Sequence, residues 1–118
     1  MAPTPFYSPW RRAGDLVIVS GQLGLLPESG DLVEGGTAAE LRQALVNGSA
    51  VLRGAGAGLS DVVKATIFIL DMGDFTACNE VWLETFSDPL PARSTVAVAA
   101  LPRGARAEVE FFAYSPEG

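Results

Sequence analysis

The sequence contains no histidine and only one cysteine, Cys78. Without them the chain cannot form an internal disulfide, build a zinc site of the usual cysteine and histidine type, or use a Ser-His-Asp or Cys-His arrangement for catalysis. Cys78 itself falls on an apolar stripe, which is typical of a core residue rather than a reactive thiol. Carboxylate, guanidinium, hydroxyl and amide groups remain as candidates for chemistry.

Basic residues are also scarce. The chain has 8 Lys and Arg against 14 Asp and Glu, a net charge of −6, and its only basic pair is Arg11 with Arg12. Nucleic-acid binding usually needs a clustered basic face, so we expect no nucleic-acid partner. The N-terminus lacks the features of a signal peptide, and no apolar run approaches the ~20 residues of a membrane span. We therefore expect no membrane partner and a cytoplasmic location.

What the chain does have is enough apolar material for one core. Hydrophobic residues make up 48 % of the 118 residues and charged residues 19 %. The length suits a single domain covering residues 1–118. A domain of this size buries a limited fraction of its surface, so oligomerisation would help to stabilise it.

The hydrophobic pattern predicts an α+β domain. Apolar residues at helical spacing predict one helix from about Ala38 to Arg53 and another from about Asp74 to Phe86, with Thr37 and Glu40 forming a capping box before the first. Alternating and β-branched runs predict strands at 7–12, 15–20, 61–70, 94–100 and 106–114, with an optional further strand before the first helix. Two helices on one face of a mixed sheet fit this order.

The last strand shows that the second face of the sheet is not an ordinary solvent-exposed face. Alternation places Ala107, Val109, Phe111 and Ala113 on one side and Glu108, Glu110, Phe112 and Tyr114 on the other. Aromatic side chains beside carboxylates suit a subunit interface better than open solvent. We expect an oligomer that packs sheet against sheet.

Arg93, Glu108 and Glu110 are the charged candidates for a site. Arg93 begins an alternating strand; its guanidinium either grips a ligand carboxylate or forms a structural ion pair with Glu108 or Glu110. The two glutamates lie two residues apart on one strand face, which should raise the pKa of at least one of them and fit it for proton transfer. A solvated, non-functional face is the alternative for this pair.

Four further residues could line a ligand site. Asn79 falls within the apolar stripe of the second helix, where a buried amide needs a hydrogen-bond partner and either ties down a loop or faces a ligand. Ser20 has no histidine to activate it, so hydrogen bonding is its realistic role. Gly21 allows close approach of a backbone or ligand, and Tyr7 offers an aromatic wall with a polar tip, or is an ordinary partly buried tyrosine.

Several motifs, in order and spacing, resemble the reactive intermediate deaminase family, also called the YjgF/Rid or endoribonuclease L-PSP-like family. They lie at 14–22, 61–64, 74–75 with 79–81, 91–94 with 96–98, and 101–102 leading to 108–110, and the resemblance extends from Tyr7 to Tyr114. Some positions depart from the pattern: Trp82 replaces a smaller aromatic, Thr95 stands where cysteine is frequent, and the stretch from Asn79 to Arg93 is shorter.

The resemblance implies a chorismate-mutase-like α+β fold and a homotrimer whose sheets enclose a barrel-like core, with an active site in each cleft between subunits. It implies that Arg93 holds the substrate carboxylate and that Glu108 serves the attacking water and proton transfer, while Glu110 has no assigned role. The cleft would be lined by Tyr7, Ser20, Asn79 and the backbone of Gly21.

The activity implied is hydrolysis of 2-imino or 2-enamino acids, such as 2-iminobutanoate and 2-iminopropanoate, to 2-keto acids and ammonia, with no metal and no cofactor. One alternative is the deamination of another carboxylated imine in a degradation pathway. Another is a non-catalytic trimer that binds small carboxylates and regulates a partner. Ribonuclease activity is the least favoured, because the chain is acidic and has no histidine.

Overall fold

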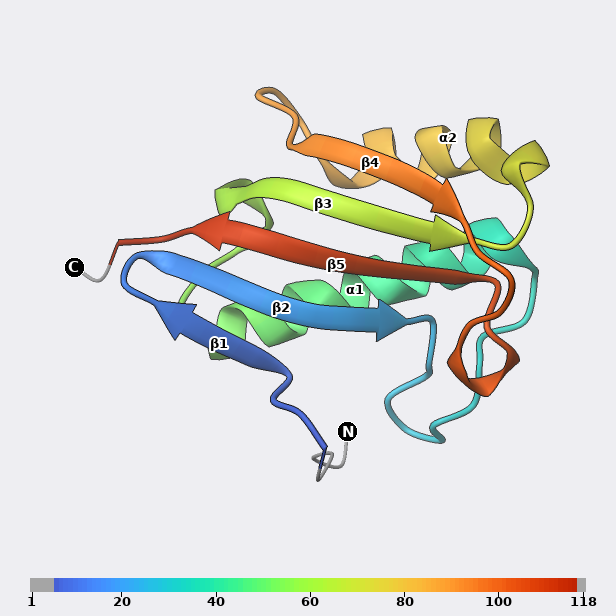
Figure 1. The fold of residues 1–118 in the computed structure, drawn as a ribbon, viewed down its shortest axis with the longest axis horizontal. Coiled ribbons are helices and arrows are strands. Elements are labelled where there is room, and N and C mark those ends of the chain that lie inside the picture. Colours follow the sequence, from blue (N-terminus) through green and yellow to red (C-terminus); the bar gives the residue numbers. More distant parts are fainter. Residues whose placement is uncertain (1–5, 117–118) are drawn as a thin grey trace.

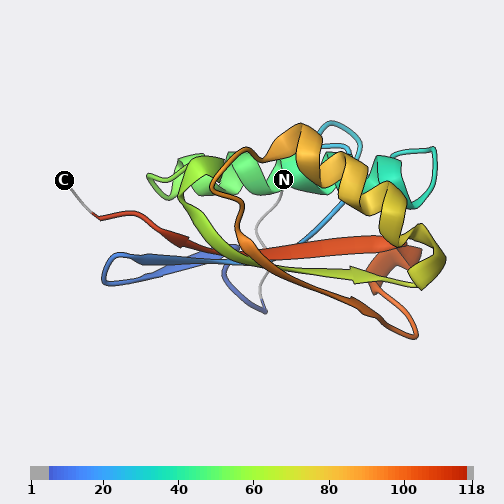
Figure 2. The same cartoon turned by 90° about the horizontal axis from the view of Figure 1, so that it is seen from above.

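The computed structural model describes residues 6–116, which form a five-stranded sheet with two helices on one face (Figure 1, Figure 2). Three short 3-10 turns link these elements, at Leu59–Asp61, Met72–Asp74 and Pro102–Gly104. The strands are β1 (Trp10–Ala13), β2 (Leu16–Leu23), β3 (Val62–Ile69), β4 (Ala92–Ala97) and β5 (Ala107–Tyr114); the helices are α1 (Thr37–Gly54) and α2 (Phe75–Thr85).

The sheet order is β1-β2-β5-β3-β4, with β3 and β4 parallel and every other pair antiparallel. The helix α2 forms the crossover between the two parallel strands, as such a pairing requires. The mixed sheet and the α+β class predicted from the sequence are confirmed. The optional strand before α1 is reduced to one isolated bridge between Leu25 and Leu32.

Strand β2 continues past the predicted end at Ser20, because Gln22 and Leu23 still pair with β5 beyond a bulge. Val19 pairs with Phe111, but Gln22 pairs with Val109, so β2 has one extra residue between these pairs. The bulge lies at Ser20 and Gly21, and it changes the direction of the strand at this point. Strand β4 also differs from the prediction: it begins at Ala92 and ends at Ala97, so it includes Arg93.

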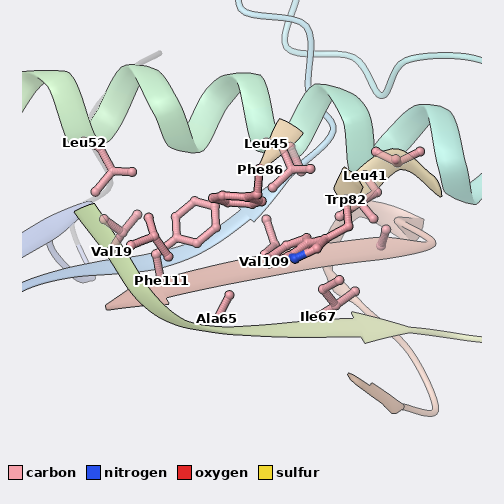
Figure 3. Close-up of a cluster of buried hydrophobic side chains, with 14 of the residues drawn as sticks. Val19, Leu41, Leu45, Leu52, Ala65, Ile67, Trp82, Phe86, Val109 and Phe111 are labelled. Carbon is pink, nitrogen blue, oxygen red and sulfur yellow. The ribbon is translucent and has the colours of Figure 1, made fainter. Parts of the chain in front are cut away.

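The hydrophobic core lies between the sheet and the helices (Figure 3). Leu41, Leu45 and Leu52 of α1 are at most 1 % exposed, and they pack over the centre of the sheet. From α2 and its end, Trp82 and Phe86 pack with their ring centroids 4.3 Å apart. Cys78 is fully buried, in agreement with its predicted core role.

The predicted capping box at Thr37 and Glu40 is wrong. The N-cap is Gly36, no side chain caps the helix, and Thr37 is the first helical residue. The Thr37 hydroxyl instead donates to Asp74 Oδ2 at 2.7 Å. Glu40 is only 1 % exposed and accepts from the backbone N–H of Arg106 at 2.7 Å and from its Nη1 at 3.3 Å. This charge-assisted pairing outcompetes the local cap.

The face of the sheet opposite the helices carries no layer of its own among residues 6–116 (Figure 2). Its residues include Tyr114 and Val96, which are 55 % and 40 % exposed, and the partly buried Phe68, Glu108 and Phe112. None of the described helices is long and apolar enough to cross a lipid bilayer.

Candidate functional site

Arg93 lies on the helix side of the sheet, against α2. It pairs with Ala65, a fully buried residue that faces the helices, so its own side chain points to the same face. Its Nη2 donates to Asn79 Oδ1 at 2.5 Å. The guanidinium carbon lies 5.5 Å from the ring centroid of Phe75 and 5.2 Å from that of Trp82. We call these four residues, Phe75, Asn79, Trp82 and Arg93, the arginine cage.

The cage fixes the guanidinium without neutralising it. Both aromatic contacts are within the distance at which a cation is attracted to a ring face. Burial lowers the pKa of Arg93 from its usual value, and the neighbouring Cys78 acts in the opposite direction. The group stays charged, since arginine is protonated in proteins. Among residues 6–116 no carboxylate pairs with Arg93, so the structural ion pair considered from the sequence is absent.

Asn79 is hydrogen-bonded to a side chain of strand β4 and not to a loop. It is half-buried on α2 and holds the guanidinium through its side-chain oxygen. Because α2 is the crossover between β3 and β4, its spacing places Phe75, Asn79 and Trp82 above the same part of β4. The two aromatic residues were predicted only as an apolar stripe. Their distances of four and three residues from Asn79 are the signal that identifies them as cage walls.

Glu108 projects from the other face of the sheet. It pairs with Phe68, and both of its strand neighbours, Ala107 and Val109, are fully buried on the helix side. Its carboxylate lies directly against the Gly21 backbone at the β2 bulge, where an added Cβ would overlap the Glu108 Oε2 atom. Glycine at position 21 is therefore what allows this carboxylate to lie where it does.

The environment of Glu108 favours its neutral form. Burial raises the pKa of Glu108, and the negative charge of Glu110 raises it further. This agrees with the sequence-based expectation that one of the two carboxyls would be shifted upward. A carboxyl with a raised pKa can exchange a proton with a reacting group near neutral pH more readily than an ordinary one.

Ser20 and Tyr7 lie near Gly21 but differ in how they are held. The Ser20 hydroxyl donates to the carbonyl oxygen of Ser8 at 2.6 Å. Tyr7 is 61 % exposed. Both line a pocket of about 480 Å³ between the end of β2 and α1, together with Gly21. Sequence reasoning missed this pocket, because its remaining walls come from three segments far apart in the sequence: Pro9 and Trp10, positions between Gln22 and Pro27, and α1.

The candidate residues thus form two groups on opposite sides of the sheet. Arg93 and Asn79 lie at the edge strand β4 under α2, whereas Glu108, Gly21 and Ser20 lie around the β2 bulge. Strand β3 and the thickness of the sheet separate the guanidinium from the Glu108 carboxylate. No group of three histidine, cysteine, aspartate or glutamate side chains in the described part of the chain could hold a metal ion.

The comparisons with known proteins agree on one family. The family described as endoribonuclease L-PSP matches residues 1–115. A protein of Dermatophagoides farinae named 2-iminobutanoate/2-iminopropanoate deaminase is 46 % identical over 112 residues, covering 93 % of this chain and 88 % of the relative. A human protein with the same name is 45 % identical over 94 residues, covering 80 % of this chain and 69 % of the relative.

Solved structures share the fold. The crystal structure of RidA from the Antarctic bacterium Psychrobacter sp. PAMC 21119 superimposes with a TM-score of 0.90 at 42 % identity, covering 96 % of this chain and 93 % of the other. A structure described as a putative endoribonuclease from Thermotoga maritima gives a TM-score of 0.90, also at 42 % identity, over 99 % of this chain and 93 % of the other.

Proposed function

The chain belongs to the endoribonuclease L-PSP family, which includes the reactive intermediate deaminases, and from this premise we propose that it hydrolyses 2-imino and 2-enamino acids to 2-keto acids and ammonia. The relatives named as deaminases of 2-iminobutanoate and 2-iminopropanoate support these two compounds as first candidates. The reaction takes up one water and releases one ammonia, so it needs neither an oxidant nor a reductant.

The observation that carries this proposal is the arginine cage. Arg93 is held by two aromatic rings and an amide oxygen, and no carboxylate of the described chain pairs with it. A partly desolvated guanidinium with unused N–H donors binds a carboxylate through two parallel hydrogen bonds. The substrate class supplies such a carboxylate next to the reacting C=N carbon, so Arg93 would fix the orientation of that carbon.

Glu108 provides the proton transfer. The substrate reacts with its imine nitrogen protonated. The ionised carboxylate accepts a proton from a water molecule as the water oxygen bonds to the C=N carbon and the C=N π electrons move to the nitrogen, giving a neutral carbinolamine. The protonated carboxyl then donates to the amino nitrogen, and as the C–N bond breaks and the C=O bond forms, ammonia leaves and the carbinolamine hydroxyl returns its proton to the carboxylate, which passes it to solvent. A pKa raised by burial and by Glu110 suits a group that must both accept and donate a proton at near-neutral pH.

We further propose that each site is shared between two copies of the chain in a homotrimer. Arg93 and Glu108 project from opposite faces of one sheet, so they meet across a single substrate only when they come from different copies. The open sheet face, with its mixture of aromatic side chains and carboxylates, supplies a surface on which a second copy could pack. Small domains also gain stability from such contacts.

The test is a comparison of wild type with Arg93→Ala. Each imine is generated in place and competed with semicarbazide, and keto-acid formation is measured. We expect wild type to accelerate hydrolysis and Arg93→Ala to lose most of the acceleration, with the oligomer unchanged by light scattering. Arg42→Ala is the matched control, because Arg42 is an exposed arginine paired only with the exposed Glu84.

Four results would argue against the proposal. Failure of folded wild type to accelerate either imine would reject these substrates, and equal loss in both arginine variants would reject the carboxylate clamp. If Arg93→Ala binds and turns over as well as wild type, the cage serves structure alone. Binding of 2-keto acids without any turnover by wild type would favour a ligand-binding regulator instead.

A further inference from the structure

The pocket between β2 and α1 is larger than the proposed small substrates require. Its volume is about 480 Å³, within the range of sites that bind whole small molecules. A methyl or ethyl side chain, as in 2-iminopropanoate or 2-iminobutanoate, would leave most of it unfilled. Its walls beyond the bulge are formed by Trp10, Leu23, Leu25, Asn47, Val51 and Gly54.

The chemistry of these walls suits an apolar group. None of the lining residues that the structure describes carries a formal charge. Three polar side chains of the lining are already engaged within the chain: the Ser20 hydroxyl donates to the carbonyl of Ser8, Gln22 Nε2 to that of Ser20 at 2.9 Å, and Asn47 Nδ2 to those of Leu23 and Leu25 at 3.0 and 2.8 Å. The Tyr7 side chain, by contrast, is 61 % exposed. A charged or strongly polar ligand would find few unused partners there.

The pocket and the proposed catalytic carboxylate reach the same β2 bulge from opposite faces of the sheet. Gly21 lines the pocket on one side and touches the carboxylate of Glu108 on the other. Strand β1 pairs with β2 only as far as Val19, so the outer edge of β2 from Gly21 to Leu23 carries no described strand partner. A substrate whose reacting carbon is held near Glu108 could therefore extend its side chain around this edge and into the pocket.

We propose that this pocket receives the side chain of the imino acid, and that the preferred substrates carry a branched or aromatic apolar side chain. This rests on the proposed function and adds a substrate class to it. A larger apolar side chain would remove more apolar surface from water at Trp10, Leu25 and Val51 than a methyl group can. The pocket would thus set specificity, while Arg93 and Glu108 serve all substrates alike.

The test is to fill the pocket and compare two substrates. Ala50 lines it from the exposed surface of α1, so Ala50→Phe should occupy it without disturbing the core. Gly54→Leu fills it from a second point, and a Cβ there meets no atom within 4 Å. The matched control is Val46→Phe, which places the same ring on the same helix at an exposed position outside the pocket.

We expect kcat/KM for 2-imino-3-phenylpropanoate to fall about tenfold or more in both filling variants, the scale on which an apolar pocket discriminates. The value for 2-iminopropanoate should stay within about twofold of wild type, as should both values in Val46→Phe. Equal effects on the two imines in every variant would overturn the proposal. A changed oligomeric state in the filling variants, seen by light scattering, would assign the pocket to a contact between copies and also overturn it.

The experiments can reject the pocket proposal and the proposed reaction independently of each other. Hydrolysis of 2-iminopropanoate that depends on Arg93, without any selective effect of filling, would leave the reaction standing and reject the pocket. If no imine is hydrolysed, calorimetric titration with phenylpyruvate and pyruvate still tests whether the pocket receives the side chain. Tighter binding of phenylpyruvate by wild type, lost in Ala50→Phe, would support the pocket, and equal binding of the two keto acids would reject it.

Discussion

At the scale of single residues, the two charged groups of the site are prepared in opposite ways. Arg93 is held by neutral partners, two rings and an amide, so its charge remains available for a ligand. Glu108 is partly buried and lies beside a second carboxylate, and both features raise its pKa. Both residues could be identified as candidates from the sequence. The surroundings of Arg93 could not be predicted, because the arginine cage depends on how α2 lies over β4.

The first prediction concerns Glu110, which lies on the same strand face as Glu108. If ionised Glu108 is the base, the acid limb of kcat/KM against pH lies above the ordinary glutamate pKa, since burial and Glu110 both raise the pKa of Glu108. Glu110→Gln removes the second cause and should move this limb to lower pH. Below the wild-type limb the variant would therefore be the faster enzyme. Burial, the larger cause, remains, so the limb should not fall to the ordinary value.

The measurement is a pH profile of imine hydrolysis for both proteins. Glu84→Gln serves as the control, because Glu84 is an exposed residue of α2 and its replacement should leave the limb in place. An acid limb that shifts upward in Glu110→Gln, or does not move, would contradict the electrostatic coupling between the two carboxyls.

At the scale of elements, the order of strands and helices follows from periodicity, whereas the details that position the site do not. The predicted helix limits lie within a residue or two of α1 and α2. The β2 bulge was not predicted, because the shift in alternation that it causes falls on Ser20, Gly21 and Gln22, none of which is apolar. The role of Glu40 was also misread: its distance from Thr37 matches a capping box, while its actual partner, Arg106, lies 66 residues away.

The contact between Glu40 and Arg106 carries the second prediction, on stability. It joins α1 to the start of β5, the strand that carries Glu108. Glu40→Ala removes a buried carboxylate and leaves the partly buried backbone N–H of Arg106 without its acceptor, so we expect the free energy of unfolding to fall by roughly 1–3 kcal/mol. Glu84→Ala breaks only an exposed ion pair with Arg42 and should cost about 0–1 kcal/mol.

Urea denaturation checks both values at matched chain concentration, since assembly contributes to the apparent stability. Glu40→Gln keeps an acceptor for the N–H and should retain more of the stability than Glu40→Ala. Equal losses in the alanine variants of Glu40 and Glu84 would show that the buried contact does not hold the two elements together.

At the scale of the whole molecule, the sheet has one face covered by helices and one face without a layer (Figure 2). The sequence indicated this arrangement, because two helices cover only one face and the last strand alternates between two kinds of side chain. It could not indicate that Arg93 and Glu108 lie on different faces. That fact depends on the register of β4 and β5 against β3, which brings Ala65 beside Arg93 and Phe68 beside Glu108.

This separation gives the last prediction, a complementation experiment. Arg93→Ala and Glu108→Ala should each be inactive alone. When the two are unfolded, mixed in equal amounts and refolded together, a site shared between neighbouring copies takes its arginine from one chain and its glutamate from another. Each has an even chance of being intact, so about one quarter of wild-type activity should return in a closed ring of any size.

Two controls accompany the mixture: each variant refolded alone, and a chain that carries both substitutions refolded with an equal amount of wild type. In that second mixture intact arginine and intact glutamate again meet at about one quarter of shared sites, but at about half of the sites if each lies within one chain. A mixture of the single variants with no more activity than its components would show that Arg93 and Glu108 act within the same chain or not at all, and the shared site would be rejected.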